Sequence, residues 1–97
     1  MKELKQNRKT QYTQMVLKDS LMELMREKPV FKITIKEICE NADINRTTFY
    51  AYYADQYELL KSVEDSIIEW VKAMISEISE TTDENGIKRI LEKYLNI

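Results

Sequence analysis

Three side chains near the middle of the chain could together bind nucleic acid. Arg46, Thr47 and Tyr50 have the spacing that places residues on one face of a helix. They supply a guanidinium, a hydroxyl and a phenol, groups that bind guanine edges, thymine methyls and phosphate oxygens. The face carries no carboxylate, whereas a helix face that only meets solvent more often shows Glu and Lys pairs. The pattern therefore predicts a DNA contact, and a plain solvent-exposed face is the alternative.

Two helix starts lie close to this face and would position it. Thr34 and Glu37 have the spacing of a capping box, with Ile33 and Ile38 at the two ends of a hydrophobic staple. We expect a short helix from about Ile35 to Asn41.

A tight turn is expected over residues 42–44, where Asp43 tolerates a left-handed backbone. Asn45 is a strong N-cap for a second helix that begins at Arg46. Helices joined by so short a turn cross steeply, as in a helix-turn-helix. The small core between them would contain Ile38, Ile44, Phe49 and Tyr53, with Cys39 where the helices come closest.

The rest of the sequence is also predicted to be helical. A first helix is expected from about Thr10 to Lys28, the residue before Pro29, with a buried face that consists of Val16, Leu17, Leu21, Leu24 and Met25. Met15, Met22 and Met25 are expected to fill gaps in the core. Residues 1–9 are expected to be a frayed basic arm, either a disordered terminus or a phosphate contact made by Lys2, Lys5, Arg8 and Lys9.

A long helix should follow, capped by Asp55 with Glu58 three positions later and running to about Ser79. Its apolar face is wider than a three-helix domain can cover, and Trp70 is assigned to a core or an interface. A last helix is expected from Gly86 to Leu95. The predicted fold is all-α: a three-helix helix-turn-helix domain over residues 1–56, and over 57–97 a connecting helix and the beginning of a further helical domain.

Composition excludes several classes of function. One cysteine and no histidine in 97 residues leave no zinc site and no Cys/His nucleophile. Glu37 and Glu40 have plain helical explanations, so we expect no enzyme, no metal and no cofactor. No signal peptide and no apolar run of about 18 residues is visible, which predicts a cytoplasmic protein without a membrane segment.

Charge is unevenly distributed although the net charge is only −2. Residues 1–56 hold ten Lys and Arg against eight Asp and Glu, giving +2, whereas residues 57–97 hold five against nine, giving −4. Salt screens charges beyond about 8 Å, so the local patch decides contact with DNA.

Residues from about Tyr12 to Ser62 resemble the amino-terminal DNA-binding domain of TetR-type bacterial transcriptional regulators. The resemblance rests on three runs of the sequence, which are ITIKEI from Ile33 to Ile38, ADIN from Ala42 to Asn45 and TFYAYY from Thr48 to Tyr53, followed by Leu59 and Leu60. Asp43 stands where the family usually has glycine, and Gln56 stands where it usually has a phosphate-binding lysine. The glycine common between the first two helices is absent, with Pro29 nearby.

The resemblance implies a repressor that binds a near-palindromic double-stranded operator as a homodimer and responds to a small-molecule effector. It implies DNA contacts by Thr34, Lys36, Asn45, Arg46, Thr47, Thr48, Tyr50 and Tyr52, with Arg8 and Lys9 as a further backbone-contacting arm. Arg46 is the candidate for a base, and Tyr50 resembles the family's phosphate-binding tyrosine. Each of three residues also has an alternative role without DNA. Thr34 could serve only as a helix cap, Lys36 could be a solvated lysine, and Tyr52 could pack against the core. The alternative function is a small helical protein–protein interaction module that has lost DNA binding.

Overall fold

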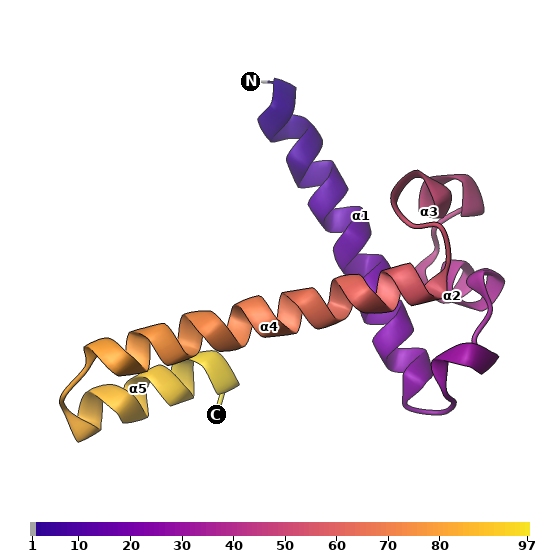
Figure 1. Cartoon of the computed structure of the whole chain (residues 1–97). Helices are drawn as coiled ribbons and strands as arrows, with labels where there is room; N and C mark the ends of the chain where they lie inside the picture. The colour runs from indigo at the N-terminus through magenta and orange to yellow at the C-terminus, as the bar shows by residue number, and fades with distance from the viewer. Residues whose placement is uncertain (1) are drawn as a thin grey trace. The chain divides into compact units, whose positions relative to one another are not determined.

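The computed structural model of this chain describes the backbone of residues 2–97 and the side chains of residues 8–97. Within this range it is helical without strands, so the all-α prediction is confirmed. The elements follow in the order α1 (Lys2–Met25), the 3-10 helix η1 (Val30–Lys32), α2 (Ile35–Ala42), α3 (Arg46–Tyr52), α4 (Gln56–Glu80) and α5 (Glu84–Leu95) (Figure 1). The chain forms two compact units, residues 1–63 and residues 64–97, and α4 contributes to both. The predicted domain division at residue 56 stays a prediction.

The start of α1 differs from the prediction. The helix begins at Lys2 and not near Thr10, so the frayed arm expected for residues 1–9 is wrong for residues 2–9. This segment contains no glycine or proline, and its Lys, Glu, Leu, Gln and Arg residues are good helix formers. Arg8 and Lys9 are exposed on this helix, whereas the side chains of Lys2 and Lys5 lie outside the described residues.

The core of the first unit lies where α1, α2, α3 and the beginning of α4 meet. Its buried residues are Leu17, Leu21, Ile33, Ile38, Cys39, Phe49, Tyr53, Leu59 and Val63. Of the core predicted between α2 and α3, Ile38, Cys39, Phe49 and Tyr53 are among them, and Ile44 is half-buried against the cluster. Of the face predicted for α1, Leu17 and Leu21 are buried and Leu24 and Met25 are half-buried against the cluster, whereas Val16 is half-buried outside it. Each fully buried leucine, isoleucine or phenylalanine contributes about 1.5–3 kcal/mol.

A buried polar link also ties α1 to α2. The Ser20 hydroxyl, 4% exposed, donates to the carbonyl of Ile38 at 2.9 Å and accepts from Nδ2 of Asn41 at 3.0 Å. It thus satisfies a polar group that would otherwise be costly to bury.

Two of the three methionines predicted to fill the core do not do so. Met25 packs against the core cluster, but Met15 and Met22 are 51% and 44% exposed. Met15 and Met22 lie on the side of α1 that faces away from Leu17 and Leu21. Neither methionine is three or four residues from either leucine, the spacing that would place them on the same face. The prediction was wrong because it treated each methionine as apolar without placing it on the helix wheel.

The second unit consists of α5 and the part of α4 from Glu64 onward, which lie antiparallel (Figure 1). The Trp70 and Tyr94 rings pack edge to face with centroids 6.1 Å apart, and Nζ of Lys93 lies 3.0 Å from Oε1 of Glu77. The Tyr94 hydroxyl donates to the same carboxylate. No residue of this unit is buried, in contrast to the first unit.

Helix ends in the second unit follow local chemistry. Asp83 caps α5 by accepting from the Asn85 N–H at 3.2 Å, and α4 ends at Glu80, one residue beyond the prediction. None of the helices described for residues 2–97 combines the length and the hydropathy that a bilayer crossing requires.

Candidate nucleic-acid interface

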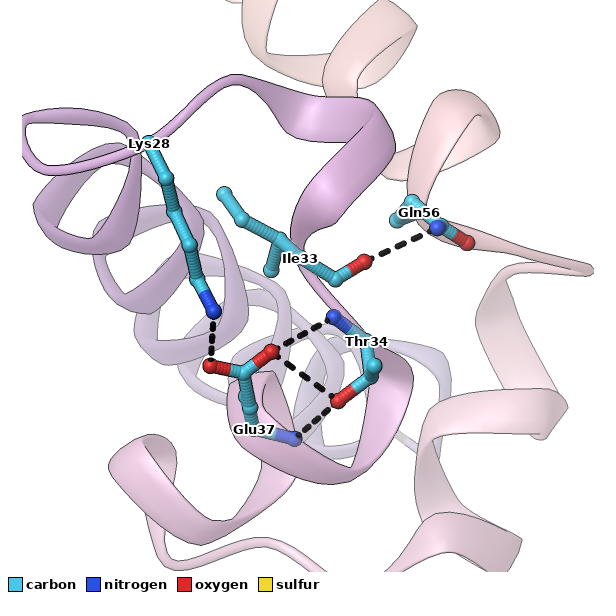
Figure 2. A network of polar contacts seen from close by, with 5 residues as sticks. All are labelled: Lys28, Ile33, Thr34, Glu37 and Gln56. Carbon is cyan, nitrogen blue, oxygen red and sulfur yellow. Dashed lines mark hydrogen bonds and ion pairs between the residues drawn. The ribbon is translucent and has the colours of Figure 1, made fainter.

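The start of α2 is fixed by a reciprocal cap, as the sequence predicted. Oγ1 of Thr34 accepts from the Glu37 N–H at 3.1 Å. In return, Oε1 of Glu37 accepts from the Thr34 N–H at 3.0 Å and from the Thr34 hydroxyl at 3.2 Å. Figure 2 shows this capping box and its neighbours. Two orphan N–H groups of the helix start are thereby satisfied.

Lys28 joins the capping box from the turn that follows α1. Its Nζ donates to Oε2 of Glu37, the oxygen that the cap leaves free. The ammonium, followed by the Thr34 N–H, lowers the pKa of the Glu37 carboxyl from its usual value. The carboxylate therefore stays charged at neutral pH and holds three donors from two segments.

Gln56, the first residue of α4, adds a third segment to this network. Its Nε2 donates to the carbonyl of Ile33 at 2.9 Å (Figure 2). Ile33 is itself 1% exposed and directly precedes the cap residue Thr34. The side chain at the position where the resembled family has lysine thus makes an intramolecular contact with the entry to α2.

The connection between α2 and α3 is three residues long. Asp43 has φ 57° and ψ 44°, the left-handed conformation predicted for it, and its N–H donates to the carbonyls of Cys39 and Glu40. The Ile44 N–H donates to the Cys39 carbonyl at 3.0 Å. These bonds close the end of α2 in the manner of a left-handed C-cap.

Asn45 begins α3 as its N-cap, because its Oδ1 accepts from the Thr48 N–H at 2.9 Å. Phe49 is fully buried, and its ring packs near that of Tyr53, with centroids 5.8 Å apart. These contacts fix the rotation of the helix about its axis. Arg46, Thr47 and Tyr50 are consequently exposed on the outside, and α3 contains no acidic residue.

A shallow hollow of about 530 Å³ lies between α2 and the beginning of α3. Lys36 and Arg46 line it together with Asn45, and the acidic residues Glu40 and Asp43 line it as well. Three of the predicted site residues are therefore brought to one place on the surface. The Arg46 charge also reaches Cys39, where it partly offsets the effect of burial, which raises the pKa of that thiol.

The last turn of α3 contacts α1. The Tyr52 hydroxyl lies 3.4 Å from Oγ1 of Thr10, and the Tyr52 side chain is half-buried against the core cluster. This contact brings the α1 turn that follows Arg8 and Lys9 next to α3. Tyr52 thus has a packing role, while a DNA contact by the same residue stays a prediction.

Thr34, which is exposed, and Thr48, which is half-buried, both use their polar groups within the chain. The Thr34 hydroxyl and N–H are both engaged by the Glu37 carboxylate, and the half-buried Thr48 gives its N–H to Asn45. Sequence reasoning missed the roles of Lys28, Ser20 and Asn41. A serine three residues after the buried Leu17 was the available signal, because that spacing places it on the core side of α1.

Comparison with known proteins gives a distant similarity that covers part of the chain. A 47-residue stretch covering 48% of the chain is 34% identical to an uncharacterized HTH-type transcriptional regulator, YxbF, of Bacillus subtilis (strain 168). The aligned stretch spans only 12% of that protein's length. No protein-family model matches the chain, and no solved structure gives a significant match. The chain is therefore distantly similar, over about half its length, to a protein described as a transcriptional regulator.

Proposed function

We propose that this chain is the DNA-binding part of a transcriptional regulator of the TetR type, in which α2 and α3 form a helix-turn-helix. The observation that carries the proposal is the outer face of α3. Arg46, Thr47 and Tyr50 are exposed there without a neighbouring acid on the helix, while Phe49 anchors the helix from the other side. The distant similarity to a protein named as an HTH-type regulator supports it.

In this proposal α3 lies in the major groove. The Arg46 guanidinium pairs with guanine O6 and N7, and Thr47 approaches a neighbouring base or methyl group. Tyr50 and Lys36 contact phosphates on the two sides of the groove. The Asn45 amide, whose oxygen is used in capping, keeps its N–H groups for a phosphate or base.

Further residues would help to position the domain on the DNA backbone, namely Thr34, Thr48, Tyr52, Arg8 and Lys9. Thr34 is the N-cap of α2 and Thr48 lies in the first turn of α3, where the N–H groups that capping leaves free and the helix dipole favour an anion. The contact between Thr10 and Tyr52 holds the helix that carries Arg8 and Lys9 against α3. Both basic side chains then add non-specific attraction to the DNA backbone.

The regulator acts as a homodimer in this proposal. Two copies would place their α3 helices in successive major grooves, about 34–36 Å apart, over a near-palindromic operator. A small-molecule effector bound by further helical structure would repress or release binding through α4, because it favours one of two conformations. The chain needs no cofactor for this function.

The test is selection of the 97-residue chain against a pool of random DNA duplexes. We expect enrichment of a palindrome with fixed half-site spacing, and affinity that falls steeply as salt rises. Arg46→Ala should weaken binding to the enriched site by about 1–3 kcal/mol and relax the base preference at one position. Arg89→Ala is the matched control, because Arg89 is an exposed arginine on α5, and it should bind as the wild type does.

Failure to enrich any sequence, with binding equally weak in wild type and Arg46→Ala, would contradict the proposal. That result would favour the interaction module, whose apolar association changes little with salt.

A further inference from the structure

The hollow between α2 and the beginning of α3 carries charges of both signs. Lys36 and Arg46 line it together with the carboxylates of Glu40 and Asp43, and all four residues are exposed. The ion pairs described above involve none of them. Hydrogen-bond donors and acceptors thus lie side by side on a surface that is open to a ligand.

The position of Glu40 is unfavourable for the helix that carries it. Glu40 stands in the last turn of α2, and that turn contains no basic residue. The carbonyl groups at the end of a helix carry partial negative charge, so a carboxylate there destabilises the helix. Lys36 precedes Glu40 by four residues, which is the weaker order for an ion pair along a helix. Helix stability therefore does not explain this residue.

A phosphate group is an unsuitable ligand for the part of the hollow beside Glu40 and Asp43. Phosphate oxygens would meet two carboxylates there, and like charges at contact range repel each other. The edge of a G·C base pair is suitable. In the major groove it presents the O6 and N7 acceptors of guanine beside the N4 amino donor of cytosine. The hollow offers the complementary pattern, with the Arg46 guanidinium beside carboxylate acceptors.

We propose that Glu40 reads a cytosine in the operator. The inference rests on the proposed function, in which Arg46 binds a guanine. The Glu40 carboxylate accepts from the N4 amino group of a cytosine in the same base pair as that guanine or in an adjoining pair. Thymine presents the O4 acceptor at this edge, so the carboxylate repels it, and repulsion of the wrong base adds to specificity.

Glu40 is better suited to this contact than Asp43. Its side chain is one methylene group longer, and it lies on a helix, which holds a contacting group more precisely than a turn does. Asp43 already has a local role, because its left-handed backbone ends α2. Glu40 is therefore the specificity-determining residue that α2 contributes, next to Arg46 from α3.

The test uses the operator duplex that the wild-type chain enriches. The guanine bound by Arg46 is the position at which Arg46→Ala loses its base preference. N4-methylcytosine keeps Watson–Crick pairing but replaces the N–H in the major groove by a methyl group, and it is placed singly at each cytosine in that base pair and its neighbours. Wild type should bind one of these duplexes about tenfold more weakly than the unmodified one. Glu40→Ala should bind both with equal affinity.

Two variants are matched controls. Glu27→Ala removes an exposed carboxylate outside the hollow, and Asp43→Gly removes the second carboxylate of the hollow without straining the turn. Both should respond to N4-methylcytosine as the wild type does. Thermal unfolding gives an independent readout. Glu40→Ala should melt no lower than wild type, because it removes a charge that the end of α2 disfavours.

Three results would overturn the inference. Wild-type binding that is unchanged by N4-methylation at all of these cytosines would mean that the hollow does not read the amino group. Equal sensitivity in wild type and Glu40→Ala would assign the contact to another residue. Melting of Glu40→Ala well below wild type would give Glu40 a structural role.

These failures are distinguishable from failure of the proposed function. In each of them, enrichment of a site that depends on Arg46 would leave the proposed DNA binding intact. If the chain enriches no site, both proposals are wrong.

Discussion

At the scale of single residues, Glu37 and Ser20 connect helices that the sequence presents as separate. Glu37 receives hydrogen bonds from Thr34 in its own cap and from Lys28 across a turn. Ser20 bonds the backbone of α2 from within α1. The cap could be predicted because its partners are three residues apart. The Lys28 and Ser20 contacts could not, because they depend on how α1 and α2 pack.

The Glu37 network predicts a pH-dependent contribution to stability. The pKa of Glu37 is lowered in the folded chain, so the contribution is present above the ordinary glutamate pKa of about 4.3 and is lost as pH falls through the lowered value. Lys28→Met, which keeps the length of the stem without the ammonium, should be less stable than wild type at pH 7. Thermal unfolding should show the two melting temperatures converging in acid, and a gap that stays constant down to pH 2 would contradict this account.

Removal of the Ser20 hydroxyl should destabilise the first unit. Ser20→Ala removes the hydroxyl that bonds the Ile38 carbonyl and the exposed Asn41 amide, and the loss of a hydrogen bond of this kind costs about 0.5–1.5 kcal/mol. Urea unfolding followed by circular dichroism measures the change. Ser76→Ala, at an exposed position of α4, is the matched control and should change stability by less than about 0.5 kcal/mol.

At the scale of elements, the connection between α2 and α3 decides how the outer face of α3 is presented. The sequence placed this turn one residue too early, over 42–44, because Ala42 still belongs to α2. The left-handed Asp43 and the N-cap Asn45 were predicted correctly, since both are residue types that favour their observed conformations. The rotation of α3 also followed from sequence, because the aromatic Phe49 is its one fully buried residue.

The left-handed backbone at Asp43 gives an ordered series of stabilities. Asp43→Gly should be as stable as wild type or slightly more so, since glycine adopts φ 57° without steric cost. Asp43→Val should lose about 1–2 kcal/mol, because a β-branched residue is strained there. Equal midpoints for the valine and glycine variants in urea would show that the turn can change its conformation.

The connection before α5 restricts Gly86 in another way. A Cβ added at Gly86 would lie 2.9 Å from Oγ1 and 3.2 Å from Cγ2 of Thr81. Gly86→Ala alone should therefore gain less than the ~1 kcal/mol that alanine normally adds to a helix. In a Thr81→Ala background the same substitution should give the full gain, and a double-mutant cycle in urea measures the difference. A coupling of zero would mean that Thr81 rotates away without cost.

At the scale of the whole molecule, the two units differ in how they are stabilised. The first contains nine buried apolar residues in one cluster, and residues 64–97 contain none. The sequence indicated this difference, because the apolar residues after Val63 outnumber what a three-helix domain can cover. It did not show that α1 begins at Lys2, because helix propensity alone does not decide whether a terminal segment continues a helix.

Hydrogen exchange should reveal the difference directly. In dilute solution, amides of α5 and of α4 beyond Val63 should exchange much faster than those beside Leu21 and Phe49, since few buried contacts oppose local opening. Mass spectrometry of peptic fragments measures this. Protection of residues 64–80 should rise with protein concentration if two copies pair, while that of the first unit stays constant.

Burial of Cys39 gives the protein an internal reporter of its own opening. The thiol is 4% exposed, and burial raises its pKa, so the thiolate that reacts with alkylating reagents is scarce while α2 and α3 stay packed. Labelling must therefore wait for these helices to separate. The labelling rate of Cys39 therefore reports how often α2 and α3 separate in the unmodified chain. Slower labelling on addition of an operator duplex would measure how strongly that duplex stabilises the packed α2 and α3.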